Sequence, residues 1–304
     1  MDKDTEKSLG ATMEEKLVYK KKNFFEEAED AKVKEAFDYA VGYMKYIDDS
    51  KTEREAVTAS IKYAEKMGFT EYNFGDKICV GDKKYYNNRG KSLVLFKIGK
   101  EDIAKHGVRI LASHVDAPRI DVKQNPLYED SGMAFLKTHY YGGIKKYQWT
   151  AIPLALHGVV VLASGEVVDV CIGEDDNDPV LYITDLLPHL AQDQMKRSAP
   201  ELIKGEELNL LIGSMPVTDD TDAKCLVKEQ ILQILNEKYG ITEEDFLSAE
   251  LSAVPAFPTR DIGLDRSLIG AYGHDDRVCA YPSLTALLES EDSTHTLMCI
   301  LADK

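Results

Sequence analysis

Two short apolar runs in the first half of the chain place the strongest constraint on its fold. Residues 93–98 (LVLFKI) and 108–113 (VRILAS) are rich in β-branched and apolar side chains and are bounded by glycine and charge, as strands are. Helical patterns precede these runs, and a similar texture returns after residue 273. Such an order predicts an α/β domain with short, buried strands.

The first 68 residues predict helices. Apolar side chains recur at three- and four-residue spacings between residues 26 and 48, which is an amphipathic pattern. Thr52 is a candidate N-cap with Glu55 three residues later, the arrangement called a capping box. The helix that follows is expected to end at Met67-Gly68, because glycine favours the backbone conformation found just past a helix end.

The middle of the chain predicts a separate β-rich unit. Residues 159–163 and 167–172 are strand runs joined at Ser164-Gly165, a hairpin signal. We therefore predict a β-rich domain over residues 121–270, inserted into an α/β domain formed by residues 1–120 and 271–304. The remaining predicted elements are strands at 77–80, 181–184 and 296–301 and helices at 185–196, 221–238 and 281–288.

Composition excludes several classes of function. The net charge is −16, and no basic stripe is present that could neutralise phosphates, so we predict no nucleic-acid partner. No apolar run reaches the roughly 18 residues of a membrane span, so we predict no membrane partner. Residues 1–19 are polar and acidic, without the features of a signal peptide, which predicts a cytoplasmic protein. Cys171, Cys279 and Cys299 lie in apolar contexts and are expected to be buried.

The sharpest local feature is His114-Val115-Asp116, directly after the apolar run 108–113. Binding sites in open α/β sheets lie beyond the carboxyl ends of strands. A histidine there could bind a metal, while the carboxylate two residues later holds its other ring nitrogen. The alternative is a hydrogen-bonded histidine in a turn, and the tripeptide alone does not decide between the two.

Two further segments each have a functional and a structural interpretation. Residues 271–277 (AYGHDDR) place two adjacent acids and an arginine before an apolar run, which suggests carboxylates bound to metal or paired at the edge of a core. The structural alternative is that these acids form salt bridges at the N-terminus of a helix. Residues 140–149 (YYGGIKKYQW) flank paired glycines with aromatic side chains and contain the single tryptophan. This loop packs against a substrate or a partner chain, or it is a structural turn.

Together these segments resemble the M18 aminopeptidases, the aspartyl aminopeptidase and aminopeptidase I group, and most closely their bacterial branch. Residues 114–119 (HVDAPR) are similar to the family's H-x-D-x-P segment, and residues 270–277 to the segment that bears its metal-bridging acid. Residues 141–143 with Trp149 are similar to its YGG…W segment. Residues 186–191 (LLPHLA) are similar to a family helix that begins near P-H-L. The similar segments follow the family's order over nearly the whole chain.

The resemblance implies a zinc-peptidase α/β/α core, incomplete at the C-terminus, with an inserted β-rich dimerisation domain. It implies His114 and Asp275 as metal ligands, with His274 in the leucine position of the family's L-D-N, and Asp116 as the acid that orients His114. The implied cofactor is zinc, two ions per complete active site, and cobalt or manganese could take the same ligands. The implied reaction removes N-terminal residues from a peptide substrate by attack of a metal-activated water. The family's dimers assemble into a homo-oligomeric dodecamer.

Two departures from the family pattern change what is expected. In the family, a strand like residues 296–302 leads into an acidic pair that supplies the general base and a metal ligand. We expect these residues and the remaining ligands to lie beyond Lys304, so that residues 1–304 alone bind zinc weakly and hydrolyse nothing.

The second departure is Tyr147. Animal and yeast-type members carry a histidine at the matching position, where it reaches the site of a neighbouring subunit. Tyr147 can donate a hydrogen bond there but cannot carry a positive charge near neutral pH.

Two other functions compete with this interpretation. One is a non-enzymatic scaffold subunit that uses the β-rich domain for assembly, although a scaffold has no need of His114, Asp116 and Asp275. The other is a cocatalytic aminopeptidase of the M42 type, which shares the H-x-D and D-D-R elements. The YGG…W segment favours M18.

Overall fold

The computed structural model describes residues 8–217, 225–291 and 293–304. The chain forms two compact units, residues 1–43 and 44–304. The first contains α1 (Leu9–Leu17), α2 (Phe24–Glu27) and the start of α3 (Asp30–Asp48), which continues into the second unit. α3 confirms the amphipathic helix that the sequence predicts between residues 26 and 48.

Helix α4 (Glu53–Lys66) begins at the predicted capping box. The Thr52 side chain accepts a hydrogen bond from the Glu55 backbone, and the Glu55 side chain accepts one from the Thr52 backbone. Gly68 follows the helix with a φ of 84°, as a residue past a helix end commonly does. α4 packs against the first sheet, as does α7 (His274–Glu289). Tyr63 of α4 and Tyr281 of α7 meet edge-to-face, so both helices lie on the same side of that sheet.

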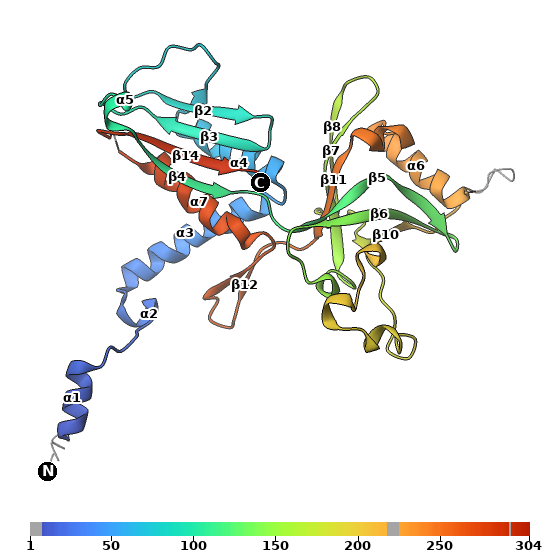
Figure 1. Ribbon diagram of the computed structural model, residues 1–304, viewed down its shortest axis with the longest axis horizontal. Coiled ribbons are helices and arrows are strands. Elements are labelled where there is room, and N and C mark those ends of the chain that lie inside the picture. The colour runs from blue at the N-terminus through green and yellow to red at the C-terminus, as the bar shows by residue number, and fades with distance from the viewer. Residues whose placement is uncertain (1–7, 218–224, 292) are drawn as a thin grey trace. The chain divides into compact units, whose positions relative to one another are not determined.

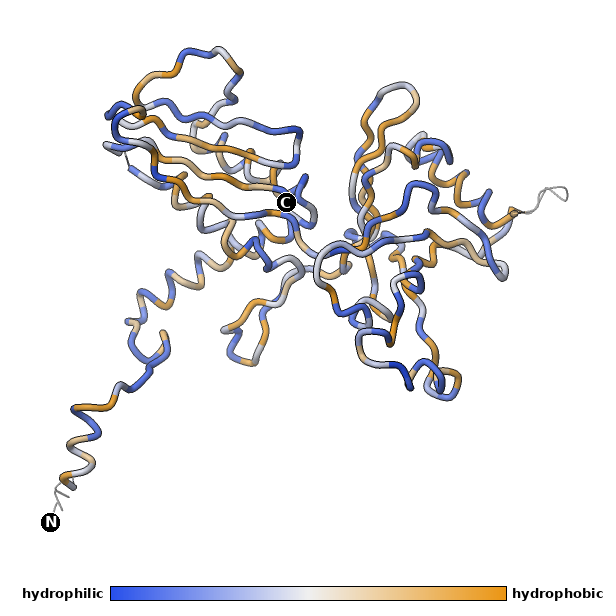
Figure 2. Tube along the Cα trace, viewed as in Figure 1, coloured by the Kyte–Doolittle hydropathy of each residue, from blue (hydrophilic) through white to orange (hydrophobic). Residues whose placement is uncertain are grey.

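The first sheet has five strands in the order β1-β2-β3-β14-β4. The last strand in sequence, β14, lies between β3 and β4, antiparallel to β3 and parallel to β4 (Figure 1). Figure 2 shows β3 and β14 as hydrophobic strands beside the hydrophilic β2, which is nearer the edge. The strands are β1 (Thr70–Glu71), β2 (Lys83–Asn88), β3 (Ser92–Lys97), β4 (Val108–His114) and β14 (Thr296–Ala302).

The second sheet has seven strands in the order β11-β5-β6-β10-β9-β7-β8. An additional pairing of β11 with β7 closes six of these strands into a ring, which satisfies the backbone groups that an open edge would leave unpaired. β7 and β8 form the predicted hairpin, and Gly165 in their turn has a φ of 86°. The strands are β5 (Arg119–Asp130), β6 (Met133–Tyr141), β7 (Pro153–Val161), β8 (Val167–Ile172), β9 (Leu181–Tyr182), β10 (Leu210–Gly213) and β11 (Glu250–Pro255).

The seven-stranded sheet encloses its own hydrophobic core. Ile120, Leu136, Leu154 and Leu210 are among its buried side chains, and α6 (Leu226–Tyr239) packs against β6, β5 and β10. Both the sheet and its core come from the stretch that follows His114. The remaining short elements are α5 (Ile103–His106), β12 (Arg260–Ile262), β13 (Leu268–Gly270), η1 (Lys146–Gln148), η2 (Gln194–Lys196), η3 (Ala199–Glu201), η4 (Gly205–Glu207) and η5 (Glu243–Ser248).

Two predicted elements are wrong. Residues 185–196 form turns and the short η2 instead of a helix. Pro188 lacks a backbone N–H and restricts the residue before it, and Leu186, Leu187 and Leu190 are exposed, so no buried face would stabilise a helix there. Residues 77–80 form no strand. The predicted helix at 221–238 is observed as α6, and its first four residues lie outside the described part of the chain.

The burial predicted for three cysteines is right for one of them. Cys299 is buried in β14, which has a neighbouring strand on each side. Cys171 is exposed because it alternates with the buried Val170 on the edge strand β8. Cys279, on α7, is exposed. None of the described helices is both long enough and apolar enough to cross a membrane.

Candidate metal centre

His114 is the last residue of β4 and lies beside Ala302 of the parallel strand β14. The backbone N–H of Val115 donates to the carbonyl of Ala302, so the chain stays against the sheet as the strand ends. The His114 side chain is 20% exposed, whereas Asp116 is buried. The apolar run 108–113 forms the strand that carries the histidine to the end of the sheet, as predicted. It is not the buried strand that the sequence predicts, because β4 is an edge strand and Ile110 and Leu111 are exposed.

The Nδ1 atom of His114 is held by two oxygens of the same residue. It lies 3.0 Å from the backbone carbonyl oxygen of Asp116 and 3.2 Å from Oδ1 of its carboxylate. A backbone carbonyl oxygen and an ionised carboxylate oxygen can accept hydrogen bonds but cannot donate them, so Nδ1 must carry the proton. In the neutral ring this leaves the lone pair on Nε2, the atom that can bind a metal.

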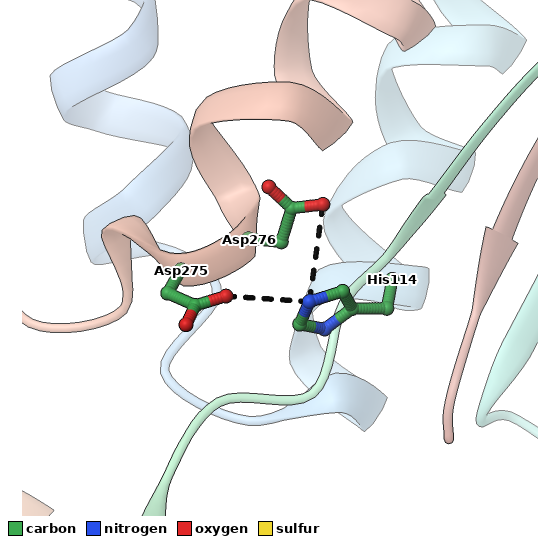
Figure 3. A group of neighbouring side chains, drawn as sticks. All are labelled: His114, Asp275 and Asp276. Carbon is green, nitrogen blue, oxygen red and sulfur yellow. Dashed lines mark ion pairs between the residues drawn. The ribbon is translucent and has the colours of Figure 1, made fainter. Parts of the chain in front are cut away.

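Nε2 of His114 faces two carboxylates from the start of α7. Oδ1 of Asp275 is 3.3 Å away and Oδ2 of Asp276 is 3.9 Å away (Figure 3). Both acids have non-helical backbone angles, and the peptide bond between them is cis. The side chain of Asp275 is 78% exposed and that of Asp276 21%, so the cluster is open on the Asp275 side.

Asp276 is the residue of this cluster that the sequence interpretation did not include. The resemblance assigned Asp275 alone, whereas the fold brings both acids to His114. The signal was the adjacent acid pair itself. Sequence alone could not decide which of the two carboxylates turns toward the sheet, because the irregular start of α7 sets their directions.

The donor set fits a metal of the zinc type. One imidazole nitrogen and two carboxylate oxygens lie within 4.8 Å of one another. Ligand atoms at the corners of a tetrahedron with bonds of about 2.1 Å are roughly 3.4 Å apart, which is near the 3.3 and 3.9 Å observed. Three protein ligands leave one position open, as in catalytic zinc sites, and cobalt or manganese accepts the same donors.

The carboxylate of Asp116 is itself held on both oxygens. Oδ2 accepts a hydrogen bond from the Tyr141 hydroxyl at 2.9 Å, and Oδ1 accepts one from the Lys304 backbone N–H at 3.1 Å. Burial by itself raises the pKa of Asp116, but these hydrogen bonds outweigh burial and hold the pKa below its ordinary value. Burial and the bond to Asp116 raise the pKa of Tyr141 to about 12.

A pocket of about 350 Å³ opens beside Asp275. The loop with the paired glycines forms one wall through Ile144, Lys145 and Trp149, and Tyr272 lies against Trp149 in an edge-to-face contact. Tyr147 does not line this pocket. It lies in η1 and is 40% exposed, and its backbone carbonyl accepts a hydrogen bond from the Thr150 hydroxyl.

Comparison with known proteins gives the chain's relationships. The profile of the family described as aminopeptidase I zinc metalloprotease (M18) matches residues 46–304. A probable M18 family aminopeptidase 1 from Clostridium acetobutylicum is 51% identical over 292 residues, which are 95% of this chain and 62% of the relative. The corresponding protein from Borrelia garinii is 44% identical over 94% of this chain and 62% of its own length.

A solved structure of the same family has a similar fold. The M18 aminopeptidase from Thermotoga maritima has a TM-score of 0.85 and is 41% identical, over 93% of this chain and 61% of its own. The mixed α/β fold that the sequence predicts is therefore confirmed, while this chain spans about 62% of the length of the curated relatives it matches. The match also decides between the M18 and M42 types that the sequence left open. This chain belongs to the M18 family of aminopeptidase I zinc metalloproteases.

Proposed function

We propose that this chain supplies the His114 centre of a metal-dependent aminopeptidase that removes N-terminal residues from peptides. The observation that carries the proposal is the oriented imidazole of His114 facing Asp275 and Asp276, in a chain of the M18 family. When bound, zinc would polarise the scissile carbonyl and lower the pKa of a bound water. Two zinc ions per complete site are part of the proposal, and Asp275 is one of the residues that would hold them.

The chain's own residues bind and orient. Asp116 holds the proton of the neutral His114 ring on Nδ1, which leaves the lone pair of Nε2 free to bind a metal. The pocket beside Asp275 receives the N-terminal residue of the peptide, because it adjoins the exposed carboxylate of the cluster. Ile144 and Trp149 supply apolar contact, and Lys145 is the cation in its lining.

Assembly is a second part of the proposal. We propose that residues 121–270 form the dimerisation domain between the two parts of the peptidase domain, 1–120 and 271–304, and that dimers build a homo-dodecamer. The seven-stranded sheet supports this division, because all its strands lie within residues 119–255. The S. cerevisiae mApe1 dodecamer, 20% identical, shares the fold with a TM-score of 0.66. Tyr147 is exposed, as a residue that reaches a neighbouring subunit's site must be. A cytoplasmic location stays a prediction.

Residues 1–304 by themselves are proposed to bind metal weakly and to hydrolyse nothing. The cluster in the described residues offers three ligand atoms, enough for one ion with an open position but not for two.

The test measures metal content and the release of N-terminal residues from a panel of aminoacyl substrates by the full-length protein. Bound zinc and turnover that both disappear in Asp275→Asn would support the proposal. A full-length protein with neither bound metal nor turnover would contradict it and favour the scaffold alternative. Hydrolysis by residues 1–304 alone would contradict the last part.

A further inference from the structure

The tyrosine of the Tyr141-Gly142-Gly143 segment contacts the metal centre through Asp116. Its hydroxyl lies 2.9 Å from Oδ2 of Asp116 and 3.4 Å from the backbone carbonyl of Lys304. The strength of a hydrogen bond falls with distance, so the bond to Asp116 is the main one. Tyr141 ends β6, a strand of the seven-stranded sheet, whereas His114 ends β4 in the other sheet. The contact therefore connects the two sheets at the metal centre.

The hydrogen bond from Tyr141 gives the two oxygens of the Asp116 carboxylate different partners. Oδ2 is taken by the tyrosine, and Oδ1 is left for the Lys304 N–H and for Nδ1 of His114, which also lies 3.0 Å from the Asp116 backbone carbonyl. The terminal torsion of an aspartate is soft, so without a partner on Oδ2 the carboxylate can rotate and share its oxygens with His114. Tyr141 thus fixes the direction in which Asp116 accepts the His114 proton.

Tyr141 is in turn held by Arg119. The two residues are opposite one another in the β5–β6 register, and the guanidinium carbon lies 4.4 Å from the centre of the tyrosine ring. Arg119 is fixed by Asp121 at 2.8 Å and by Glu53, in the first turn of α4, at 3.3 Å. The side chains of Arg119 and Glu53 are 11% and 7% exposed, so both the cation–π contact and the ion pair are shielded from solvent.

We propose that Tyr141 is a positioning residue for His114: by holding Asp116 it keeps the imidazole in the orientation and tautomer that present Nε2 to Asp275 and Asp276. This gives the tyrosine of the YGG segment a role in metal binding as well as in the loop. Its metal-binding consequence rests on the proposed function, whereas its effect on the His114 ring does not.

The first test observes the ring directly. Metal-free residues 1–304, labelled with ¹⁵N-histidine, are compared as wild type, Tyr141→Phe and Tyr140→Phe by long-range ¹H–¹⁵N NMR, with His114 assigned from its loss in His114→Gln. The wild type and Tyr140→Phe should show neutral His114 as the Nδ1–H tautomer. Tyr141→Phe should show shifted or exchange-broadened His114 ring signals with a weaker preference for Nδ1–H, because only the Asp116 backbone carbonyl, 3.0 Å from Nδ1, then still holds the ring in place. Tyr140, the adjacent tyrosine, points to the opposite side of the strand and is the matched control.

The second test measures the Co²⁺ affinity of the full-length protein by competition with a chromophoric chelator. Tyr141→Phe should weaken it about tenfold, as losing an outer partner of a metal-binding histidine does. The double variant Tyr141→Phe/Asp116→Asn should be no weaker than Asp116→Asn alone, because Tyr141 acts through that carboxylate. Retained far-UV circular dichroism would show that Phe, which keeps the ring against Arg119, leaves the fold intact.

The outcomes separate the two proposals. If Tyr141→Phe keeps the wild-type tautomer, the positioning role is wrong, whatever the metal affinity. If the tautomer changes but full-length wild type binds no metal, Tyr141 positions His114 and the metal-centre proposal is wrong. Full additivity in the double variant would also overturn the role, because it would show that the tyrosine acts by another route.

Discussion

Two histidines of this chain lie between carboxylates, and they differ in what they leave free. His114 has Nδ1 against Asp116, while Nε2 faces Asp275 and Asp276 at 3.3 and 3.9 Å. His157, on β7, has Nδ1 2.7 Å from Glu55 and Nε2 2.9 Å from Glu174. The His114 side chain is 20% exposed and the His157 side chain only 2%.

The difference separates a binding histidine from a structural one. Both nitrogens of His157 are in short hydrogen bonds, so no lone pair remains for a ligand, and the ring ties β7 to α4. Burial alone would lower the pKa of His157, but hydrogen bonds with Cys171, Glu174 and Glu55 raise it to about 11. His157 is therefore a buried cation between two carboxylates, whereas His114 keeps one nitrogen for a ligand.

The largest expected effect comes from removing the structural histidine. His157→Ala should destabilise the fold by ~3–5 kcal/mol at pH 7, because it leaves the Glu55 and Glu174 carboxylates without their buried partner. Denaturant unfolding measures this loss. Metal affinity should stay near the wild-type value. A loss of less than about 1 kcal/mol would mean that His157 is not the charged link described here.

Removing His114 should lower metal affinity and leave stability nearly unchanged, the reverse of what is expected for His157→Ala. His114→Ala should reduce Co²⁺ affinity by more than ~100-fold, beyond the cost of losing an outer partner, and change stability little. Competition with a chelator measures the affinity. His189→Ala, which removes an exposed histidine, is the matched control and should change neither quantity. Equal affinities for the wild type and His114→Ala would place the metal elsewhere.

The pH dependence of stability should come from His157. Its pKa is raised on folding from the ordinary 6.5 to about 11, so the folded state binds more protons between these values. The stabilisation is fully present below pH 6.5 and is lost as pH rises toward 11, at up to ~1.4 kcal/mol per pH unit. Unfolding curves of the wild type and His157→Gln between pH 7 and 9 should converge. Parallel curves would contradict the assignment.

The smallest expected effect comes from a change in α4, the helix whose first turn contacts both His157 and the surroundings of the metal centre. The first turn of α4 carries Glu55, which binds His157, and Glu53, which pairs with Arg119 near the metal centre. Thr52→Ala removes the cap of this turn and should cost ~1 kcal/mol in unfolding free energy. Because Arg119 also has Asp121, His114 should keep its tautomer in this variant. A changed tautomer would show that the cap supports the metal centre as well.

Local signals predicted much of this fold and part of the site. The capping box at Thr52, the strands that became β3 and β4, the β7–β8 hairpin and helix α7 depend on neighbouring residues, and the structure contains each of them. Local context made His114, Asp116 and the acid pair at 275–276 candidates, and the resemblance to the M18 family singled out His114 and Asp275 as ligands and Asp116 as the acid that orients His114. The helix predicted at 185–196 failed because its apolar residues find no buried face.

By itself the sequence determined most of the elements, the cap of α4, the family, and which side chains are able to hold a metal. The tertiary structure decided which of them meet. Asp276 joins the cluster because α7 begins irregularly, and Tyr141 reaches Asp116 because β6 ends beside the sheet that carries His114. His157 became structural because α4 and the residues after β8 place an acid at each of its nitrogens. Short-range patterns fix backbone conformation, but contacts between residues far apart in the chain depend on how the finished elements pack.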